Sequence, residues 1–216
     1  YNMGETIYKC LNSLNTLLTR NDEIILVDDG SNLAHLNRLN KAIKGIDFIC
    51  TVKVIKKQRS VYRKLGSVRN LSINAASKKV VVLHLDADDI FSDKLKTNIK
   101  LYYLLSVIIG DVYVSGSQLQ IVSKKLIKRL PYQNIYYGED RILWSTLIVA
   151  EKILFVKHKE FRRRIPLTRS KKLIKSFILL FCVFRDELRV TNSGFITLIN
   201  LFNKLKRPYN FGRTFL

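Results

Sequence analysis

Hydrophobic and polar positions follow two different periods along the first 90 residues. Apolar residues recur at helical spacing in three segments, which predict amphipathic helices over 5–18, 33–46 and 67–77. Between them lie short apolar or β-branched runs, which predict strands at Glu23–Val27, Phe48–Ile55 and Lys79–Leu85. The repeated β-α-β-α order predicts an α/β fold with right-handed crossovers, in which helices cover both faces of a mainly parallel, Rossmann-type sheet.

The pattern is less regular after residue 91. Ser92 is expected to cap a helix from Asp93 to Leu105, Asp111–Ile121 has strand character, and Arg141–Ala150 predicts an apolar helix. Composition changes near residue 150, because residues 151–216 hold 16 Lys and Arg against 4 Asp and Glu. We therefore predict a domain over 1–150 and a basic, largely helical C-terminal extension over 151–216.

The overall composition excludes some classes of protein and limits the partners. With 47% apolar and 25% charged residues over 216 positions, the chain can bury a core, and wholesale disorder is excluded. The formal charge of +21 implies an anionic partner, which could be nucleic acid, an anionic membrane or a phosphorylated small molecule. No RNP motif or zinc finger is visible, which disfavours nucleic acid. Three widely spaced cysteines argue against a disulfide framework and favour a reducing compartment.

The chain is expected to be cytoplasmic, either soluble or peripheral on the inner face of a membrane. Residues 1–10 do not form a secretory signal, and no uncharged apolar run reaches the ~18 residues that a spanning helix needs. Arg162-Arg163-Arg164 and Lys171-Lys172 precede the apolar run Phe177–Phe184, a combination that suits an anionic membrane surface. The alternative is that the apolar run packs on the sheet and the basic face is solvated.

Two of the predicted strands end in clusters of aspartate, Asp28-Asp29-Gly30-Ser31 and Asp86-Ala87-Asp88-Asp89. Ligands of open α/β sheets bind outside the carboxyl ends of the strands. Carboxylates gathered there favour a divalent cation such as Mg²⁺ or Mn²⁺. The basic run 56–64 lies between the two clusters and would suit a diphosphate. The alternative is that these aspartates cap turns and that the basic run is a solvated loop.

Five elements in this order resemble family 2 glycosyltransferases of the GT-A fold. They are Tyr1-Asn2, Ile25–Ser31, Val68-Arg69-Asn70 with Ala75-Ala76-Ser77, Leu85–Asp89 and Gly138-Glu139-Asp140. The resemblance covers roughly residues 1–150 and implies a nucleotide-diphosphate sugar donor and inversion at the anomeric carbon. The strand that precedes Tyr-Asn in that family has no counterpart before Tyr1, so we expect it to lie outside this sequence or to be lost.

The resemblance also implies roles for individual residues. The implied donor-binding residues are Tyr1, Asn2, Asp28, Asp29, Ser31, Arg69 and Asp86. Among them, Asp28 would contact the base, Arg69 would lie near the base and phosphates, and Asp86 would contact the ribose. Asp88 would bind the divalent cation, and Asp140 would be the catalytic base.

The implied substrates are a UDP-sugar, with a GDP-sugar as the alternative, and the hydroxyl of a glycan, lipid-linked saccharide or protein. No Q-x-x-R-W motif follows Asp140, which favours transfer of one sugar per encounter. Two other functions stay open at this point. One is a non-catalytic basic module that binds nucleic acid or membrane on a degenerate transferase scaffold. The other is a sugar nucleotidyltransferase, which also uses a metal and a related sheet. Of the histidines, His84 is expected to be a hydrogen-bonded core residue, whereas His35 and His158 support no function.

Overall fold

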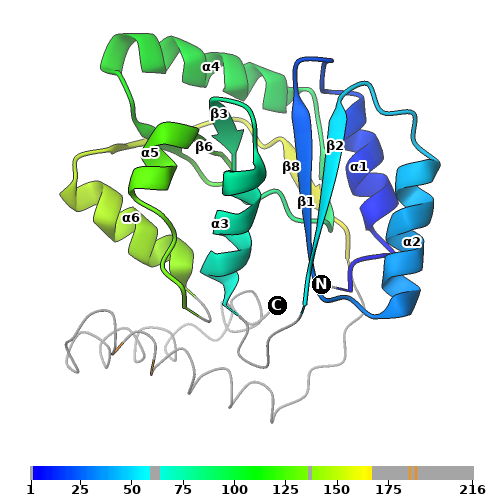
Figure 1. Cartoon of the computed structure of the whole chain (residues 1–216). Coiled ribbons are helices and arrows are strands. Elements are labelled where there is room, and N and C mark those ends of the chain that lie inside the picture. Colours follow the sequence, from blue (N-terminus) through cyan, green and yellow to red (C-terminus); the bar gives the residue numbers. More distant parts are fainter. Residues whose placement is uncertain (1, 59–63, 136–137, 167–184, 186–187, 189–216) are drawn as a thin grey trace.

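Helices and strands alternate through the residues that the computed structural model describes, which are 2–58, 64–135, 138–166, 185 and 188 (Figure 1). In chain order the elements are α1 (Ile7–Asn15), β1 (Glu23–Asp29), α2 (Leu33–Lys44), β2 (Thr51–Lys57), α3 (Leu65–Ala75), β3 (Val80–Val82), β4 (Asp89–Phe91), α4 (Lys94–Ile109), β5 (Tyr113–Ser115), β6 (Gln120–Ser123), α5 (Lys124–Arg129), α6 (Glu139–Val149), β7 (Ile153–Phe155) and β8 (Arg162–Arg164). The α/β class expected from the sequence is confirmed.

The N-terminal elements follow the predicted pattern closely. β1 and β2 pair in parallel, with Glu23 opposite Thr51 and Asp29 opposite Lys57. Helices α1 and α2 lie on one side of this pair, and α3 lies on the other (Figure 1). α2 begins where the Asn32 side chain accepts a hydrogen bond from the backbone N–H of His35, and it ends at Gly45. Local periodicity is sufficient here because each element buries one apolar face against its sequence neighbours.

The second sheet has the order β3-β6-β5-β7 and is mixed. β6 is antiparallel to both β3 and β5, whereas β5 is parallel to β7. The sequence pattern predicts one strand over 111–121, but these residues form two strands that turn back on each other. The imidazole Nε2 of His158 holds the turn, because it accepts the backbone N–H groups of Gln118 and Leu119 at 3.2 Å each. The sheets of the described residues are therefore less parallel than the β-α-β-α pattern predicts.

Two predicted boundaries differ in the structure. β3 ends at Val82, short of the predicted Leu85, and His84 adopts a left-handed backbone conformation with φ of 58°. This turn starts the segment that leads to Asp86–Asp89. The residue at the N-terminus of α4 is Asp93, and neither it nor Ser92 acts as the expected side-chain cap. α4 therefore begins without such a cap, although a helix is present where the sequence predicts one.

The described part of the predicted C-terminal extension contributes two strands. β7 pairs with β5, and β8 pairs antiparallel with β4, with Asp89 opposite Arg164 and Phe91 opposite Arg162. The expected domain boundary near residue 150 stays a prediction. The apolar run Phe177–Phe184 and Lys171-Lys172 lie outside the described residues. None of the helices in the described ranges has the length and apolar character needed to cross a membrane.

Two apolar clusters form the core. One joins α1, α2 and α4 to β1, β4, β5 and β6, and it includes Leu11, Ile24, Leu39 and Phe91. The other joins α3, α5 and α6 to β3, β5 and β6, and it includes Ile73, Leu126 and Leu147. The segment that carries Asp86–Asp89 runs between β3 and β4, so both clusters support it.

Glu23 connects the start of β1 to the end of α3, and its replacement tests this part of the fold. Its carboxylate accepts bonds from the backbone N–H groups of Ser77 and Lys78 and pairs with Lys53, although only 5% of the side chain is exposed. Burial acts to raise the pKa of Glu23, but these hydrogen bonds together lower it below its usual value. Glu23→Gln should lower the free energy of unfolding by about 1–2 kcal/mol at pH 7.

The pH dependence has a defined sign. Because the folded-state pKa of Glu23 lies below the unfolded value, its stabilisation is present above the unfolded pKa and is lost as the pH falls through the folded one. The difference between wild type and Glu23→Gln in urea unfolding should therefore shrink on acidification. Glu5→Gln, which alters an exposed pair with Arg38, is the matched control and should change stability by less than about 0.5 kcal/mol. An equal loss in both variants would contradict the assignment.

Candidate active site

Three carboxylates of residues 86–89, here called the aspartate loop, face the arginines of β8. Nη2 of Arg164 lies 2.9 Å from Oδ2 of Asp86, and its Nε lies 3.7 Å from Asp88 and 3.6 Å from Asp89. Nη1 of Arg162 lies 3.4 Å from Asp89 and donates to the carbonyl of His84 at 2.8 Å. Burial raises the pKa of Asp89, although the arginines act to lower it. The loop is thus an acidic cluster that the protein itself partly neutralises.

The Cys10 thiol lies against the same loop but is not suited to be a nucleophile. Its Sγ donates to the carbonyl of Asp86 at 3.6 Å. Burial, with the neighbouring Asp89, Asp86 and Asp88 carboxylates, raises the pKa of this thiol to about 12. Since the thiolate is the reactive form of cysteine, Cys10 is a packing residue here.

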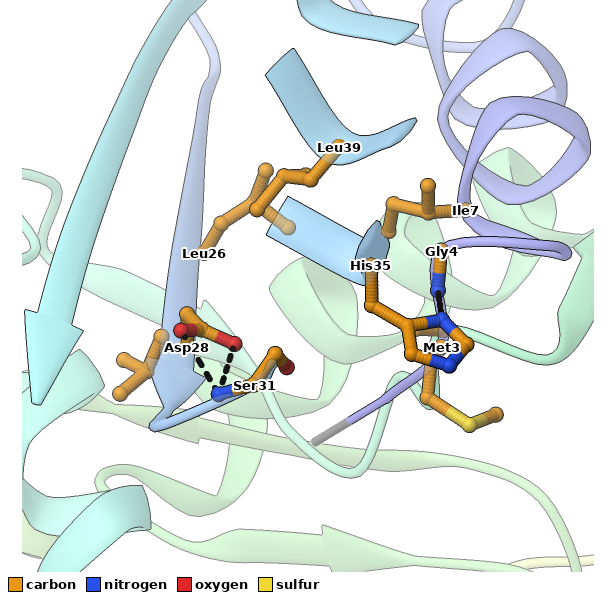
Figure 2. Close-up of a pocket in the computed structure, with 10 residues that line it drawn as sticks. Met3, Gly4, Ile7, Leu26, Asp28, Ser31, His35 and Leu39 are labelled. Atoms are coloured by element: carbon orange, nitrogen blue, oxygen red, sulfur yellow. Dashed lines mark hydrogen bonds between the residues drawn. The ribbon is translucent and has the colours of Figure 1, made fainter. Parts of the chain in front are cut away.

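A cavity of about 80 Å³ lies at the carboxyl end of β1, next to the aspartate loop (Figure 2). Its lining comes from α1, β1, α2 and the aspartate loop, and comprises Met3, Gly4, Ile7, Leu26, Val27, Asp28, Ser31, His35, Leu39 and Ala87. The Asp28 carboxylate accepts the backbone N–H of Ser31 at 3.1 and 3.3 Å, and Nδ1 of His35 accepts that of Gly4 at 3.1 Å. Because Nδ1 is an acceptor, the neutral His35 ring carries its proton on Nε2.

Arg69 lies in α3 and pairs with Glu139, the first residue of α6. Its Nε is 2.6 Å from Oε1 of Glu139, whose side chain is only 3% exposed, and its guanidinium lies over the ring of Tyr132, 5.6 Å from the centroid. Burial acts to lower the pKa of Arg69, but neighbouring negative charge, mainly Glu139, raises it above its usual value. The pair therefore holds the N-terminus of α6, and with it Asp140, against α3.

The chain between α5 and α6 is tied to α3 by further contacts. Asn70 exchanges two hydrogen bonds with the backbone of Tyr132, at 2.8 and 3.1 Å. A Cβ on Gly66 would come within 1.9 Å of the carbonyl of Gln133, so α3 approaches this segment only because residue 66 is glycine. Gly138 has φ of 83°, a conformation that favours glycine, and it precedes α6 directly. These contacts explain why α3 carries Gly66, Arg69 and Asn70. The left-handed backbone before α6 explains the glycine at position 138.

A chain of polar contacts connects the N-terminus of α6 to the aspartate loop. From Arg69 it continues through the ring of Tyr132, whose hydroxyl lies 2.7 Å from Nε2 of His84, and then through the His84 carbonyl to Arg162. Burial lowers the pKa of His84 well below its usual value, and nearby Arg69 and Arg162 add to the effect. His84 is therefore neutral, as expected of a hydrogen-bonded core residue.

Among the predicted site residues, the structure brings Asn2, Asp28 and Ser31 together next to the aspartate loop that carries Asp86 and Asp88. Asp28 and Ser31 line the cavity, and the Asn2 side-chain oxygen accepts the backbone N–H of Asn32 at 3.0 Å while the Asn2 backbone donates to Ser31 at 2.8 Å. Asp29 is buried and pairs with Lys57 at 3.2 Å. Tyr1 and most of the basic run, residues 59–63, lie outside the described residues.

Four residues at this site were not predicted from the sequence. Glu139 belongs to the Gly138-Glu139-Asp140 motif, but the sequence indicates no individual role for it, and it indicates none for His35. Arg162 and Arg164 were read as membrane-facing or solvated, but they lie on the aspartate loop, 78 positions from Asp86 in the case of Arg164. Nothing in local sequence marks these partners. The one signal in the sequence is the acidity of the loop, which indicates that basic side chains from another part of the chain must face it.

A divalent cation fits the chemistry of the aspartate loop if water or substrate oxygens complete its coordination. Within the described ranges, no group of three or more His, Cys, Asp or Glu side chains is arranged to hold a metal ion. Asp86 and Asp88 offer partly exposed carboxylate oxygens in one cluster. Mg²⁺ is commonly held by one or two carboxylates and the phosphates of a substrate, so two such residues are sufficient.

Comparison with known proteins identifies one family and one fold. The sequence model described as Glycosyl transferase family 2 matches residues 1–151. Among solved structures, TarS 1-349 of S. aureus superposes with a TM-score of 0.59 at 15% identity, covering 98% of this chain and 72% of that one. No curated protein sequence matches. At this identity the structural likeness concerns the fold alone.

Removal of the Glu139 charge tests how α6 is held. Glu139→Gln leaves Arg69 partly buried without its carboxylate and should lower the free energy of unfolding by roughly 3 kcal/mol, measured in urea. The double variant Arg69→Met/Glu139→Gln should lose less than the sum of the two single losses. Additive losses in this double-mutant cycle would show that the two side chains do not interact.

Proposed function

The chain belongs to glycosyl transferase family 2, and on this premise we propose that it is an inverting, cation-assisted transferase that moves one sugar per encounter from a nucleotide diphosphate to an acceptor hydroxyl. The observation that carries the proposal is the grouping at one region of three elements of the family resemblance. The Asp28 cavity borders the aspartate loop at Ala87, and polar contacts lead from that loop to Glu139, next to Asp140.

The cavity is proposed to take the nucleobase, with a UDP-sugar as the first candidate and a GDP-sugar as the alternative. Its volume of about 80 Å³ is far below that of a site for a whole drug-sized ligand, so it suits one part of the donor. Asp28 offers carboxylate acceptors, and Nε2 of His35 offers a donor. Uracil and guanine both carry ring N–H donors and carbonyl acceptors that complement this pair. Asn2 and Ser31 hold the turn beside it.

Asp88 and Asp86 are proposed to face the diphosphate and ribose. Asp88 would hold Mg²⁺ or Mn²⁺, and Asp86 would contact the ribose as the family resemblance implies. A bound divalent cation supplies positive charge that stabilises the diphosphate as it leaves. Arg69, which pairs with Glu139, is proposed to lie near the base and phosphates, as the family resemblance implies.

Asp140 is proposed to be the general base. Its carboxylate accepts the proton of the acceptor hydroxyl while that oxygen forms a bond to the anomeric carbon of the donor. The bond between this carbon and the diphosphate oxygen breaks on the opposite face, so the configuration inverts. General-base action of this kind contributes typically about 10²–10⁴-fold to the rate. The half-buried position of Asp140 in the first turn of α6 keeps the carboxylate at a defined place.

The acceptor is proposed to be a glycan, a lipid-linked saccharide or a protein. The formal charge of +21 supports an acceptor on an anionic membrane surface, where basic residues contribute about 1 kcal/mol each. The lack of a Q-x-x-R-W sequence after Asp140 supports a single transfer over processive polymerisation. A cytoplasmic location, peripheral to the membrane, is consistent with both proposals.

Replacement of the proposed base tests the transfer step. Asp140→Asn should lose transfer by at least about 10²-fold, because amide oxygen is a poor base, but should still bind UDP. Asp93→Asn, which changes the same atoms at the exposed N-terminus of α4, should keep both properties. The measurements are sugar transfer from a UDP-sugar panel and calorimetric titration with UDP. Transfer by Asp140→Asn at the Asp93→Asn rate would exclude Asp140 as the base.

Replacement of the proposed cation ligand tests metal assistance separately. In wild type, addition of Mn²⁺ should strengthen UDP binding, and chelation with EDTA should reverse this effect. In Asp88→Asn the gain from Mn²⁺ should largely disappear, because one hard oxygen ligand is lost. Asp47→Asn, an exposed aspartate far along the chain from the loop, serves as the control. An unchanged Mn²⁺ effect in Asp88→Asn would contradict the assignment.

A further inference from the structure

Arg162 and Arg164 lie on one face of β8, and this placement follows from the strand pairing. β8 is antiparallel to β4, with Asp89 opposite Arg164, Ile90 opposite Arg163 and Phe91 opposite Arg162. Alternate residues of a strand point to opposite faces, and directly opposed residues share a face. Arg162 and Arg164 therefore share the face of Asp89, whereas Arg163 lies on the other face.

β8 is held firmly beside the aspartate loop by its backbone. Ile165 donates its N–H to the carbonyl of Asp88 at 2.6 Å, and Ser92 donates to the carbonyl of Phe161 at 2.8 Å. The Gln118 side chain accepts the backbone N–H groups of Phe161 and Arg162 at 2.9 and 3.0 Å. These bonds fix the strand independently of the Arg164 side chain, so that side chain can change position without loss of β8.

The two arginines differ in how tightly they are held. Arg162 is mostly buried and bonds both the His84 carbonyl and Asp89, which makes it a permanent counter-ion. The Arg164 side chain is 52% exposed, and its shortest contact within the loop is with Asp86, itself half exposed, while its Nε lies 3.6 Å from the buried Asp89. Its approach to Asp88 at 3.7 Å is electrostatic only. A long, exposed side chain held in this way is exchangeable.

We propose that Arg164 competes with the divalent cation for the aspartate loop and so sets the affinity of the donor site for that cation. Arg164 holds its charge at Asp86 and Asp88, the carboxylates that the cation needs. The guanidinium and a divalent cation at the same carboxylates repel each other, so each weakens the binding of the other. Arg164 would thus act on cation binding indirectly, through its contacts with the carboxylates of Asp86 and Asp88. The inference rests on the proposed function, since it takes the cation from there.

The competition predicts that neutralisation of Arg164 tightens cation binding in the absence of any donor. Mn²⁺ binding to the full chain is measured from the loss of the free-ion electron paramagnetic resonance signal. Arg164→Ala and Arg164→Gln should each bind Mn²⁺ on the order of 10-fold more tightly than wild type, as expected for loss of a unit charge beside a divalent ion in a half-exposed site. Arg164→Lys, which keeps the charge, should stay close to wild type.

Arg163→Ala is the matched control. It removes the same charge from the adjacent position of the same strand, but on the opposite face, and should change Mn²⁺ affinity by less than about 2-fold because its charge is exposed and screened. Adding Asp88→Asn to Arg164→Ala should abolish the gain, which locates the ion at the loop. Thermal melts and circular dichroism of each variant establish that it is folded.

Each outcome decides the proposal. Tighter Mn²⁺ binding confined to the two neutral Arg164 variants supports it. Equal affinities of Arg164→Gln and Arg163→Ala overturn it, and so does an absence of Mn²⁺ binding in every variant. Sugar transfer and UDP binding are measured in parallel. A chain that shows the Arg164 effect on Mn²⁺ but transfers no sugar from any donor fails the proposed function and leaves the competition intact.

Discussion

The negative charge of the aspartate loop is the constraint on which this region of the structure depends. Three carboxylates within four residues, one of them almost fully buried, would repel one another strongly without positive charge close by. β8 supplies that charge through Arg162 and Arg164. β8, which comes from the basic C-terminal part of the sequence, is therefore held against β4. Two of its arginines neutralise carboxylates of the fold and do not contribute only to the surface charge.

The second requirement is that the N-terminus of α6 and the aspartate loop keep a fixed relation. Polar contacts through Arg69, Tyr132 and His84 meet it, because they connect the start of α6 to the backbone that carries Arg162. Neutral His84 lies between two arginines, where a charged imidazole would be repelled. A network of this kind is stable only if every buried member has a partner, and the described contacts supply one to each of these side chains. The position of α6 relative to the aspartate loop and the stability of the core thus depend on the same residues.

The fold itself persists at low sequence identity. TarS 1-349 of S. aureus has this fold although 15% of the residues are identical. Apolar cores tolerate exchange of residues if volume and pattern are kept, so a fold can persist at such an identity. Positions with stricter demands, such as glycine where α3 meets the Tyr132 segment, depend on one close contact and tolerate less. Short motifs in a fixed order are therefore informative about a family even when overall identity is low.

The sequence by itself determined the elements and most of the candidate site. Helical and strand periods are local properties, so the first two helices, β1, β2 and α3 were predicted to within a few residues, and the aspartates and the Gly138-Glu139-Asp140 motif could be identified directly. Only the tertiary structure decided which partners these residues have. The hairpin of β5 and β6, the pairing of β8 with β4, the ion pair of Arg69 with Glu139 and the arginines on the aspartate loop join positions far apart in the chain. Local sequence does not predict such pairings. They depend on which side chains are buried together and which charges lie close to each other once the whole chain is folded.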